Sequence, residues 1–242
     1  MDDLLLAWFA DNARDLPWRE TRDAYAILVS EVMLQQTQVA RVVPRYISWL
    51  ERWPTAQALG AASTADVIRE WQGLGYNRRG VNLQRAARIV AQRGWPGDLT
   101  ELPGVGRYTA DAIRAFAFGE AVLPLDTNVL RVQTRTEHAF EPASAQALFD
   151  LGREICIARV PRCDSCPLAE QCPARGTRSE PLRKQSRFDG SFRQRRAATL
   201  RLVTETPQPL VELDRDAVAS LERDGLVVSQ GGTVKLPEFT PS

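Results

Sequence analysis

Apolar residues recur at helical spacing along most of this chain. The pattern predicts amphipathic helices over residues 4–12, 24–34, 37–49, 64–71, 82–92 and 107–118. Asp23, Thr37 and Thr64 stand where helix N-caps are expected, and Pro54 and Gly60 indicate a turn. No segment before residue 175 alternates apolar and polar residues as a strand would, so this part is predicted to be all-α.

The pattern changes after that point. Residues 173–191 are rich in Pro, Gly and Ser, which predicts a linker. Helices at 194–203 and at 215–223, the second capped by Asp214, are followed by short strands at 225–228 and 233–236 with Gly231 and Gly232 in the turn. This order predicts a small winged-helix-like module, which could contact DNA or only pack against its neighbours.

These elements suggest a domain plan. We expect residues 1–20 and 127–175 to form one helical subdomain and residues 21–126 a six-helix subdomain. Residues 176–190 would be the linker and residues 191–242 the winged-helix-like module. A length of 242 residues, 44% of them apolar, allows two or three such subdomains.

Composition excludes some classes of protein. No apolar run approaches the ~18 residues that a membrane span needs, so no membrane partner is expected. The N-terminus, Met1-Asp2-Asp3, lacks the basic and apolar regions of a signal peptide, which predicts a cytoplasmic protein. The net charge of +1 is no evidence for nucleic acid. Basic residues do cluster after residue 174, which is weak support for phosphate contacts; they are Arg175, Arg178, Arg183, Lys184, Arg187, Arg193, Arg195 and Arg196, with Arg78 and Arg79 as a second group.

The chain has four cysteines and all lie in one short segment. Cys156, Cys163, Cys166 and Cys172 have the spacing C-x6-C-x2-C-x5-C. Disulfides do not suit a reducing cytosol, and structural zinc usually uses two close pairs. Four buried apolar thiols would be a poor explanation for so tight a group. An iron–sulfur cluster accepts thiolates from such a looped segment, so the spacing favours it over zinc.

The segment 102–110 has a glycine pattern with a physical meaning. Gly104 and Gly106 would form a tight turn leading directly into the helix that begins at Arg107. The turn around Val105 lets the backbone approach another surface, and the unpaired N–H groups of the helix start suit a phosphate. An ordinary corner between two helices is the alternative, which this motif alone does not exclude.

Several motifs together carry a resemblance. They are Leu16-Pro17-Trp18-Arg19, the run from Ser30 to Thr37, Trp71-Gln72-Gly73-Leu74-Gly75-Tyr76, the run from Leu102 to Ala110, Leu125-Asp126-Thr127-Asn128-Val129, and the cysteine segment. Over about residues 1–175 the chain resembles the helix–hairpin–helix DNA glycosylases, and among them the MutY-like adenine glycosylases. The resemblance implies a 4Fe–4S cluster held by the four cysteines. It also implies a monomeric bacterial enzyme, associated with the nucleoid, whose partner is double-stranded DNA containing a mismatched or damaged base pair.

Two carboxylates would divide the chemistry. Cutting an N-glycosidic bond requires protonating the leaving base and stabilising an oxocarbenium-like sugar. Glu31 lies in an apolar helix where desolvation would raise its pKa toward that of a general acid. By the resemblance it protonates the base and helps to activate water, while Asp126 faces the sugar cation. A solvent-facing Glu31 and a simple N-cap at Asp126 are the alternatives.

The resemblance also assigns further roles. Endonuclease III-like relatives carry a lysine at the position of Tyr108, which forms a Schiff base and nicks the strand, so Tyr108 implies a monofunctional enzyme. Asn128 would orient Asp126. The remaining matched positions are base-pocket residues Trp18, Arg19, Leu34 and Gln146, duplex-wedging residues Gln36 and Tyr76, and further DNA contacts at Thr37, Arg78, Gly104, Val105, Gly106 and Arg107. Core packing is the alternative for Trp18, Leu34 and Tyr76.

The chain departs from the family pattern at several places. Thr127 and Asn77 replace a typical Gly and Tyr, and the segment 135–144 is shorter than in typical relatives by about one helix. Residues 188–242 are too few for the Nudix-like domain that inspects 8-oxoguanine. The expected reaction is removal of adenine opposite 8-oxoguanine or guanine. The alternatives are a glycosylase that removes thymine or uracil opposite guanine, and a noncatalytic iron–sulfur DNA-binding regulator.

Overall fold

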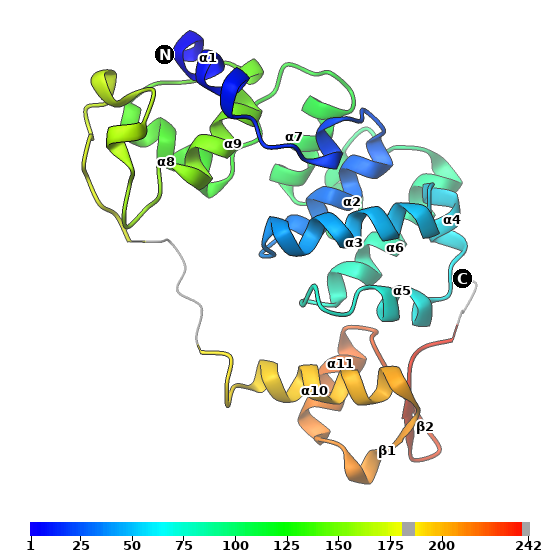
Figure 1. The fold of residues 1–242 in the computed structure, drawn as a ribbon. Helices are drawn as coiled ribbons and strands as arrows, with labels where there is room; N and C mark the ends of the chain where they lie inside the picture. Colours follow the sequence, from blue (N-terminus) through cyan, green and yellow to red (C-terminus); the bar gives the residue numbers. More distant parts are fainter. Residues whose placement is uncertain (181–186, 239–242) are drawn as a thin grey trace. The chain divides into compact units, whose positions relative to one another are not determined.

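The computed structural model describes residues 1–180 and 187–238, which form two compact units (Figure 1). Residues 1–27 and 106–184 make the first unit, and residues 28–105 and 185–242 make the second. This division differs from the predicted subdomains because the helix Arg107–Phe116 packs within the first unit, where the rings of Tyr108 and Phe116 contact Phe149. The predicted domain boundaries themselves stay a prediction.

The first unit is built from four α-helices and several 3₁₀ turns in its described residues. The helices are α1 (Asp2–Asn12), α7 (Arg107–Phe116), α8 (Thr127–Thr136) and α9 (Ala145–Glu154). The 3₁₀ turns are Pro17–Arg19, Pro142–Ser144, Cys163–Ser165 and Ala169–Gln171. Leu5 of α1, Val132 of α8 and Leu148 of α9 are fully buried in one core, which also reaches Leu168 between the cysteines.

Helix α2 (Ala24–Leu34) continues into the second unit. That unit contains α3 (Val39–Arg52), α4 (Ala56–Ala61), α5 (Thr64–Glu70), α6 (Arg78–Arg93) and the 3₁₀ turn Leu99–Glu101. The indole of Trp49 lies edge-on to those of Trp53 and Trp71, with ring centroids 4.7 and 5.3 Å apart. Such aromatic pairs add to the stabilisation that burial provides, so they fix α3 against the end of α5.

Helix starts follow the sequence in some places and differ in others. Asp23 caps α2 by accepting from the backbone N–H groups of Tyr25 and Ala26, as predicted. Thr64 is not a cap: Ser63 accepts from the backbone N–H of Asp66 instead, and its hydroxyl donates to the Asp66 carboxylate. The reciprocal Ser–Asp pair satisfies the helix start better than a residue further along could.

Two further predictions about caps and turns are wrong. Helix α3 begins at Val39, after an N-cap at Gln38 that makes no side-chain cap hydrogen bond, and the hydroxyl of Thr37 contacts the carbonyl oxygen of Leu74 instead. Gly60 lies inside α4, where the backbone of Arg88 approaches so closely that only a residue without a side chain fits easily. Thr55 provides the cap of α4 by accepting from the N–H of Ala58.

The C-terminal module lies in the second unit. It contains α10 (Phe192–Glu205), β1 (Gln208–Pro209), a 3₁₀ turn (Leu210–Glu212), α11 (Arg215–Arg223), β2 (Val228–Gln230) and β3 (Thr233–Lys235). The strands form an antiparallel sheet in the order β1-β3-β2, and Asp214 caps α11 as predicted. The sequence does not predict strand β1, because two residues, one of them a proline, carry no alternating pattern.

The module shares a hydrophobic core with the helical part of its unit. Ile68 of α5 and Val81 of α6 are buried together with Leu200, Val203 and Leu221 of the module. The Gln72 amide donates to the hydroxyl of Thr204, and Arg78 pairs with Asp224 at 3.4 Å. These contacts favour packing over DNA contact as the role of the winged-helix-like module.

We expect Leu221→Ala to lower the free energy of unfolding by about 2–5 kcal/mol, because it opens a cavity in this shared core. Leu221 has no exposed surface. Thermal unfolding followed by circular dichroism measures the loss, and Val211→Ala, at a side chain that is 82% exposed, is the matched control. A loss equal to that of the control would show that the module does not pack as described.

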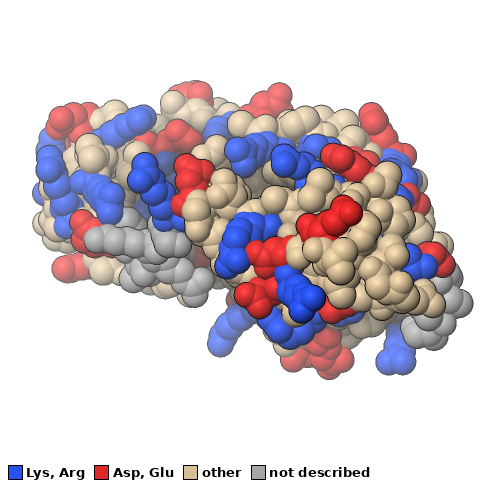
Figure 2. Space-filling view, turned by 90° about the horizontal axis from the view of Figure 1, so that it is seen from below, with Lys and Arg blue, Asp and Glu red and all other residues tan. Residues whose placement is uncertain are grey.

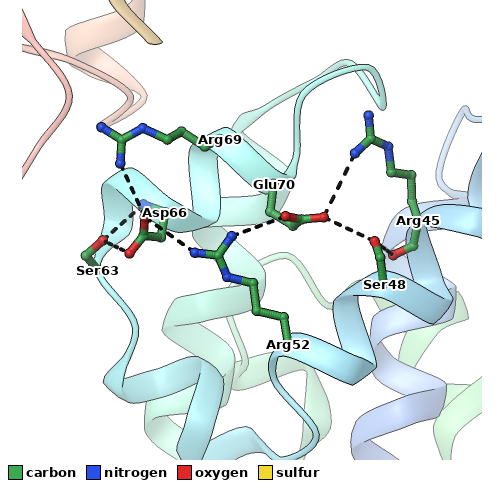
Figure 3. Close-up of polar contacts among 7 residues, drawn as sticks. All are labelled: Arg45, Ser48, Arg52, Ser63, Asp66, Arg69 and Glu70. Atoms are coloured by element: carbon green, nitrogen blue, oxygen red, sulfur yellow. Dashed lines mark hydrogen bonds and ion pairs between the residues drawn. The ribbon is translucent and has the colours of Figure 1, made fainter. Parts of the chain in front are cut away.

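A polar network joins α3 to α5 on the surface of the second unit (Figure 3). The Glu70 carboxylate accepts from the Ser48 hydroxyl at 3.1 Å and from Arg52 at 3.3 Å, and Arg45 lies 3.9 Å away. Asp66 contacts both Arg52 and Arg69. The network holds the end of α5, immediately before the loop that leads to α6.

No helix in the described part of the chain is long and apolar enough to cross a membrane.

Candidate active site

Asp126 is held by the start of α8. Its Oδ1 atom accepts from the backbone N–H groups of Asn128 and Val129 at 2.8 and 2.7 Å, so the residue is the N-cap of the helix. Its Oδ2 atom accepts from the side-chain amide of Asn128 at 2.8 Å. The N-cap alternative is therefore correct as a description of the backbone. The carboxylate is also fixed by Asn128, as expected for a residue that orients it.

Arg131 connects this carboxylate to the cysteine segment. Its Nη2 atom donates to Asn128 Oδ1 at 2.9 Å and to the carbonyl oxygen of Gly152 at 2.6 Å. Its Nε atom donates to the carbonyl oxygen of Cys156 at 2.7 Å. One guanidinium thus ties the partner of Asp126 to the backbone of the first cysteine, across α8 and α9.

Glu31 lies in the second half of α2, among buried apolar residues. It is 7% exposed, and its neighbours Val32 and Met33 are 1% and 0% exposed. The structure therefore contradicts the solvent-facing alternative for Glu31.

Tyr108 is the second residue of α7. The ring is half-buried and packs edge-on against Phe149 with ring centroids 6.2 Å apart. Helix α7 begins after the N-cap Gly106, whose lack of a side chain leaves the first N–H groups of the helix without a side-chain cap. A phenol has no amine and cannot form a Schiff base.

The hairpin before α7 has the glycine geometry that the sequence predicts. Gly104 has a φ of +84°, and Val105 is buried beneath the turn while Gly106 and Arg107 are exposed. A side chain at position 104 would come within 3.1 Å of Asn82 Cβ. The carbonyl oxygen of Gly104 accepts from the Gln35 amide at 3.3 Å, so the hairpin is connected to the end of α2.

The two predicted wedge residues share an unusual backbone. Gln36 and Tyr76 are both exposed, and both have positive φ angles, of 56° and 46°. Tyr76 keeps 43% of its surface exposed, so core packing does not explain it. Thr37 is buried with its hydroxyl on Leu74, so the structure gives it an internal role and not a place on the expected DNA surface.

The predicted base-pocket residues come from both units: Trp18, Arg19 and Gln146 from the first and Leu34 from the second. Trp18, Leu34 and Gln146 are half-buried on separate elements. The guanidinium of Arg19 donates to both carboxylate oxygens of Asp150 at 2.9 Å, and Arg14 binds the same carboxylate. The guanidinium of Arg19 is therefore engaged in an internal ion pair with Asp150.

The four cysteines line one cavity together with Val132, Arg135 and Leu168. No group of three or more His, Cys, Asp or Glu side chains in the described residues is placed to hold a single metal ion. A zinc site would need its four thiolates around one ion, whereas an iron–sulfur cluster is larger and binds a thiolate at each iron. The shared cavity fits the larger group better than it fits zinc.

Hydrogen-bond donors surround these sulfur atoms. Arg135 Nη1 donates to Cys156 Sγ at 3.4 Å, and the backbone N–H of Gly176 donates to Cys163 Sγ at 3.2 Å. Burial raises the pKa of Cys166 and of Cys172, and backbone hydrogen bonds from Leu168 and Ala174 partly offset it. Donors of this kind stabilise sulfur ligands that carry negative charge, so the chemistry of the segment suits a cluster.

Three of the six described residues in the basic cluster after the cysteines form ion pairs. Arg175 pairs with Asp164, Arg195 with Asp214, and Arg196 with Asp224. Arg183 and Lys184 lie outside the described residues. Figure 2 shows acidic and basic side chains interspersed over one face of the molecule. The paired arginines weaken the view that this run is a phosphate-binding surface by itself.

Three residues that hold site residues or their loops in place are not predicted from the sequence. Arg131 and Asp150 fix the neighbourhood of Asp126 and Arg19, and Arg79 binds the loops that carry Gln36 and Tyr76. The sequence indicates Arg79 only as part of a basic pair. The signal that could have found it is its place in the first turn of α6, directly after a glycine-rich loop whose carbonyl groups need donors.

Comparison with known proteins defines the class. The model of the HhH-GPD superfamily base excision DNA repair protein matches residues 29–152. An adenine DNA glycosylase of Mycolicibacterium smegmatis is 40% identical, covering 88% of this chain and 84% of that protein. The adenine DNA glycosylase of Homo sapiens is also 40% identical, over 71% of this chain and 38% of that protein. The chain belongs to the HhH-GPD superfamily of base excision DNA repair proteins.

Solved structures agree on the fold. A thermostable thymine-DNA glycosylase superposes with a TM-score of 0.65 at 25% identity, covering 72% of this chain and 94% of that one. Endonuclease III in a non-covalent complex with DNA gives a TM-score of 0.62 at 24% identity, over 72% of this chain and 92% of that one. The predicted all-α glycosylase fold with a small C-terminal module is confirmed.

Proposed function

We propose that this protein is a monofunctional DNA glycosylase that removes adenine mispaired with 8-oxoguanine or guanine in double-stranded DNA. The observation that carries the proposal is the Asp126 carboxylate, which Asn128 and the start of α8 hold in one orientation. The choice of adenine is supported by the names of relatives that are 39–40% identical over most of the chain. Family membership supports DNA as the partner.

The bonding of Asp126 suits the task of facing a cation. Each carboxylate oxygen has room for about two hydrogen bonds. Oδ1 accepts two from the backbone, whereas Oδ2 accepts one from Asn128. Oδ2 therefore keeps capacity to face the positive sugar carbon as the glycosidic bond breaks.

Glu31 would supply the proton. The base leaves with the electrons of the glycosidic bond, and a proton from the Glu31 carboxyl group neutralises it. Water then adds to the sugar carbon and gives up a proton, which returns the carboxyl group to its starting state. Glu31 is buried among apolar side chains, so it is shielded from bulk water at the place where the proton would be transferred.

A panel of duplexes tests this function. The protein is incubated with duplexes containing A opposite 8-oxoguanine, A opposite G, T opposite G and U opposite G, and abasic sites are then cleaved with alkali. We expect product from the two adenine duplexes. Product only from the T and U duplexes would show a glycosylase that removes thymine or uracil opposite guanine. No product from any duplex would contradict a glycosylase and favour a noncatalytic DNA-binding protein.

Tyr108 makes a separate prediction about strand cleavage. Because a phenol forms no Schiff base, strand breaks should appear only after alkali, and borohydride should trap no protein–DNA adduct. Gel electrophoresis of the reaction with and without borohydride measures this. A yield of trapped protein–DNA adduct as high as that of a lyase with a Schiff-base lysine would contradict the monofunctional assignment.

We also propose that Cys156, Cys163, Cys166 and Cys172 hold a 4Fe–4S cluster. Such a cluster, when bound, braces the segment between α9 and residue 176 and supplies no step of the base-removal chemistry. Arg131 connects this segment to Asn128 through the Cys156 carbonyl oxygen, so bracing it would also steady Asp126.

Replacing one cysteine tests the cluster. We expect the purified protein to contain about four iron and four sulfide per chain, with broad visible absorption, and Cys163→Ala to lose most of both. Iron and sulfide assays and absorption spectra of the two proteins give the comparison. One zinc per chain in place of iron would contradict the cluster.

The assembly and the location of the protein are proposed from its resemblance to the helix–hairpin–helix glycosylases. We propose that the enzyme works as a monomer in the bacterial cytoplasm on nucleoid DNA. Sedimentation of the protein alone and with duplex DNA measures the stoichiometry, and a dimer in both conditions would contradict a monomer.

A further inference from the structure

Gln36 and Tyr76 adopt a backbone conformation that side chains rarely favour. Their φ angles of 56° and 46° lie in the left-handed region. Non-glycine residues persist there only where surrounding contacts hold them. Gln36 follows the end of α2, and Tyr76 follows the glycine-rich turn after α5. Both loops belong to the second unit.

One side chain contacts both loops. Nη1 of Arg79 lies 2.7, 3.1 and 2.5 Å from the carbonyl oxygens of Val32, Met33 and Gln35. These carbonyl groups are at the C-terminal end of α2, where no helical partner remains and where a positive charge is favourable.

The other end of the guanidinium reaches the second loop. Nη2 of Arg79 donates to the Thr37 hydroxyl at 2.9 Å and to the carbonyl oxygens of Leu74 and Gly75 at 3.1 Å each. The Thr37 hydroxyl contacts Leu74 as well, at 3.2 Å. The two loops are thus joined through a single planar cation.

Aromatic rings complete the environment of this cation. The guanidinium carbon of Arg79 lies 5.4 Å from the ring centroid of Trp71 and 5.7 Å from that of Tyr76. Burial lowers the pKa of Arg79 to about 10, so the side chain remains charged at neutral pH. Tyr76 therefore rests on the same cation that fixes the backbone of both loops.

We propose that Arg79 is a positioning residue that sets Gln36 and Tyr76 in place to open the base pair. This inference rests on the proposed function and on the family resemblance, which implies that both side chains wedge into the duplex where the base is extruded. The planar guanidinium is essential because it presents donors in fixed directions to several carbonyl groups at once. Lysine offers a single charged nitrogen and would hold only part of the arrangement.

Three variants test the role of Arg79. Arg79→Met removes the donors with a side chain of similar length, and Arg79→Lys keeps the charge. Arg88→Met is the matched control, because Arg88 lies on the same helix and donates from its Nε atom to the Gly60 carbonyl oxygen at 2.9 Å, away from both loops.

Hydrogen exchange of the free protein gives the first measurement. We expect backbone amides in residues 35–38 and 73–77 to exchange at least about 10-fold faster in Arg79→Met than in the wild type, with a smaller change in Arg79→Lys. Arg88→Met should leave both loops unchanged. Equal exchange in wild type and Arg79→Met would overturn the inference whether or not the protein is a glycosylase.

Base extrusion gives the second measurement. We expect Arg79→Met to remove adenine from an A–8-oxoguanine duplex roughly 100-fold more slowly in a single turnover. The fluorescence rise of 2-aminopurine beside the target adenine should fall in parallel, and Arg79→Lys should be intermediate. Faster loop exchange with wild-type fluorescence and rate would overturn the role in extrusion. A wild-type protein that releases no base would refute the proposed function. The hydrogen-exchange result would still show whether Arg79 holds the two loops in place.

Discussion

We expect the Asp126→Asn variant to release adenine roughly 100- to 1,000-fold more slowly than the wild-type protein, with its fold intact. Asparagine is as good an N-cap as aspartate, so its side-chain oxygen can still accept from the N–H groups of Asn128 and Val129. The substitution removes the negative charge that faces the developing sugar cation, together with the hydrogen bond that Oδ2 accepts from the Asn128 side-chain amide. Single-turnover rates on an A–8-oxoguanine duplex measure the loss.

Duplex binding separates charge from structure in this experiment. The variant should bind the same duplex with an affinity within a few-fold of the wild type, because Asp126 contributes charge to the reaction and not to DNA contact. Asp126→Ala is the comparison, since it removes the cap as well and should lower stability by about 1 kcal/mol. Normal turnover by Asp126→Asn would show that the carboxylate has another role.

We expect Asp150→Asn to lower the free energy of unfolding by about 3–5 kcal/mol, because it leaves Arg14 and Arg19 without a buried counter-charge. The Asp150 side chain is 1% exposed and binds Arg14 at 2.7 Å and Arg19 at 2.9 Å. Chemical denaturation of wild type and variant gives the difference.

Acid should reproduce the effect of this substitution. Burial alone would raise the pKa of Asp150, but hydrogen bonds and charges from Arg19 and Arg14 outweigh it, so the pKa lies below the ordinary value of 3.8. A carboxyl group with a lowered folded pKa contributes stability above its unfolded pKa and loses it as the pH falls through the folded pKa. The gap between wild type and Asp150→Asn should therefore be constant from neutral pH to about pH 5, and narrow below pH 3.8.

A surface ion pair provides the control for the denaturation measurements on Asp150→Asn at neutral and acid pH. Arg69 and Asp66 lie 3.2 Å apart, but their side chains are 51% and 41% exposed (Figure 3). Arg69→Gln should cost less than about 1 kcal/mol. An Asp150→Asn variant that is equally mild would show that the buried pair contributes little.

Local signals in the sequence predict the helices of this protein well. Asp23 and Asp214 both bind the helix start as predicted, and Asp214 does so through one oxygen while the other accepts from Arg195. Thr37 and Thr64 fail as caps because other contacts decide: Ser63 forms a reciprocal pair with Asp66, and Thr37 is engaged by Arg79 and Leu74. The partners of Thr37 lie far along the chain and leave no local pattern, whereas Ser63 and Asp66 are three residues apart and form a local signal beside Thr64.

The same distinction applies to the candidate site. Asp126, Asn128 and the cysteines stand in motifs, so their types and spacing are visible in the sequence alone. Arg131, Asp150 and Arg79 each form several hydrogen bonds, with partners up to 136 residues away in sequence. The residues next to an arginine in the sequence do not indicate which carbonyl groups it will bind. These supporting residues can therefore be identified only from the three-dimensional structure.

The shared core of the C-terminal module is hidden from the sequence for a similar reason. The strands and helices of the module carry their own apolar pattern, which fits an independent domain as well as one packed on α5 and α6. Ile68 and Val81 close the core from the other side, and only the structure brings them together with Leu200 and Leu226. The module is therefore better regarded as part of its unit than as an appended reader of DNA.

The identity of the base released from DNA tests the central claim most directly. The wild-type protein is incubated with a duplex carrying one adenine opposite 8-oxoguanine and, in the same tube, a duplex carrying one thymine opposite guanine. Mass spectrometry then measures the free bases and the intact strands. We predict free adenine and an unbroken strand with one abasic site, and no free thymine. Free thymine without adenine, or an adenine-containing strand left untouched, would contradict the account.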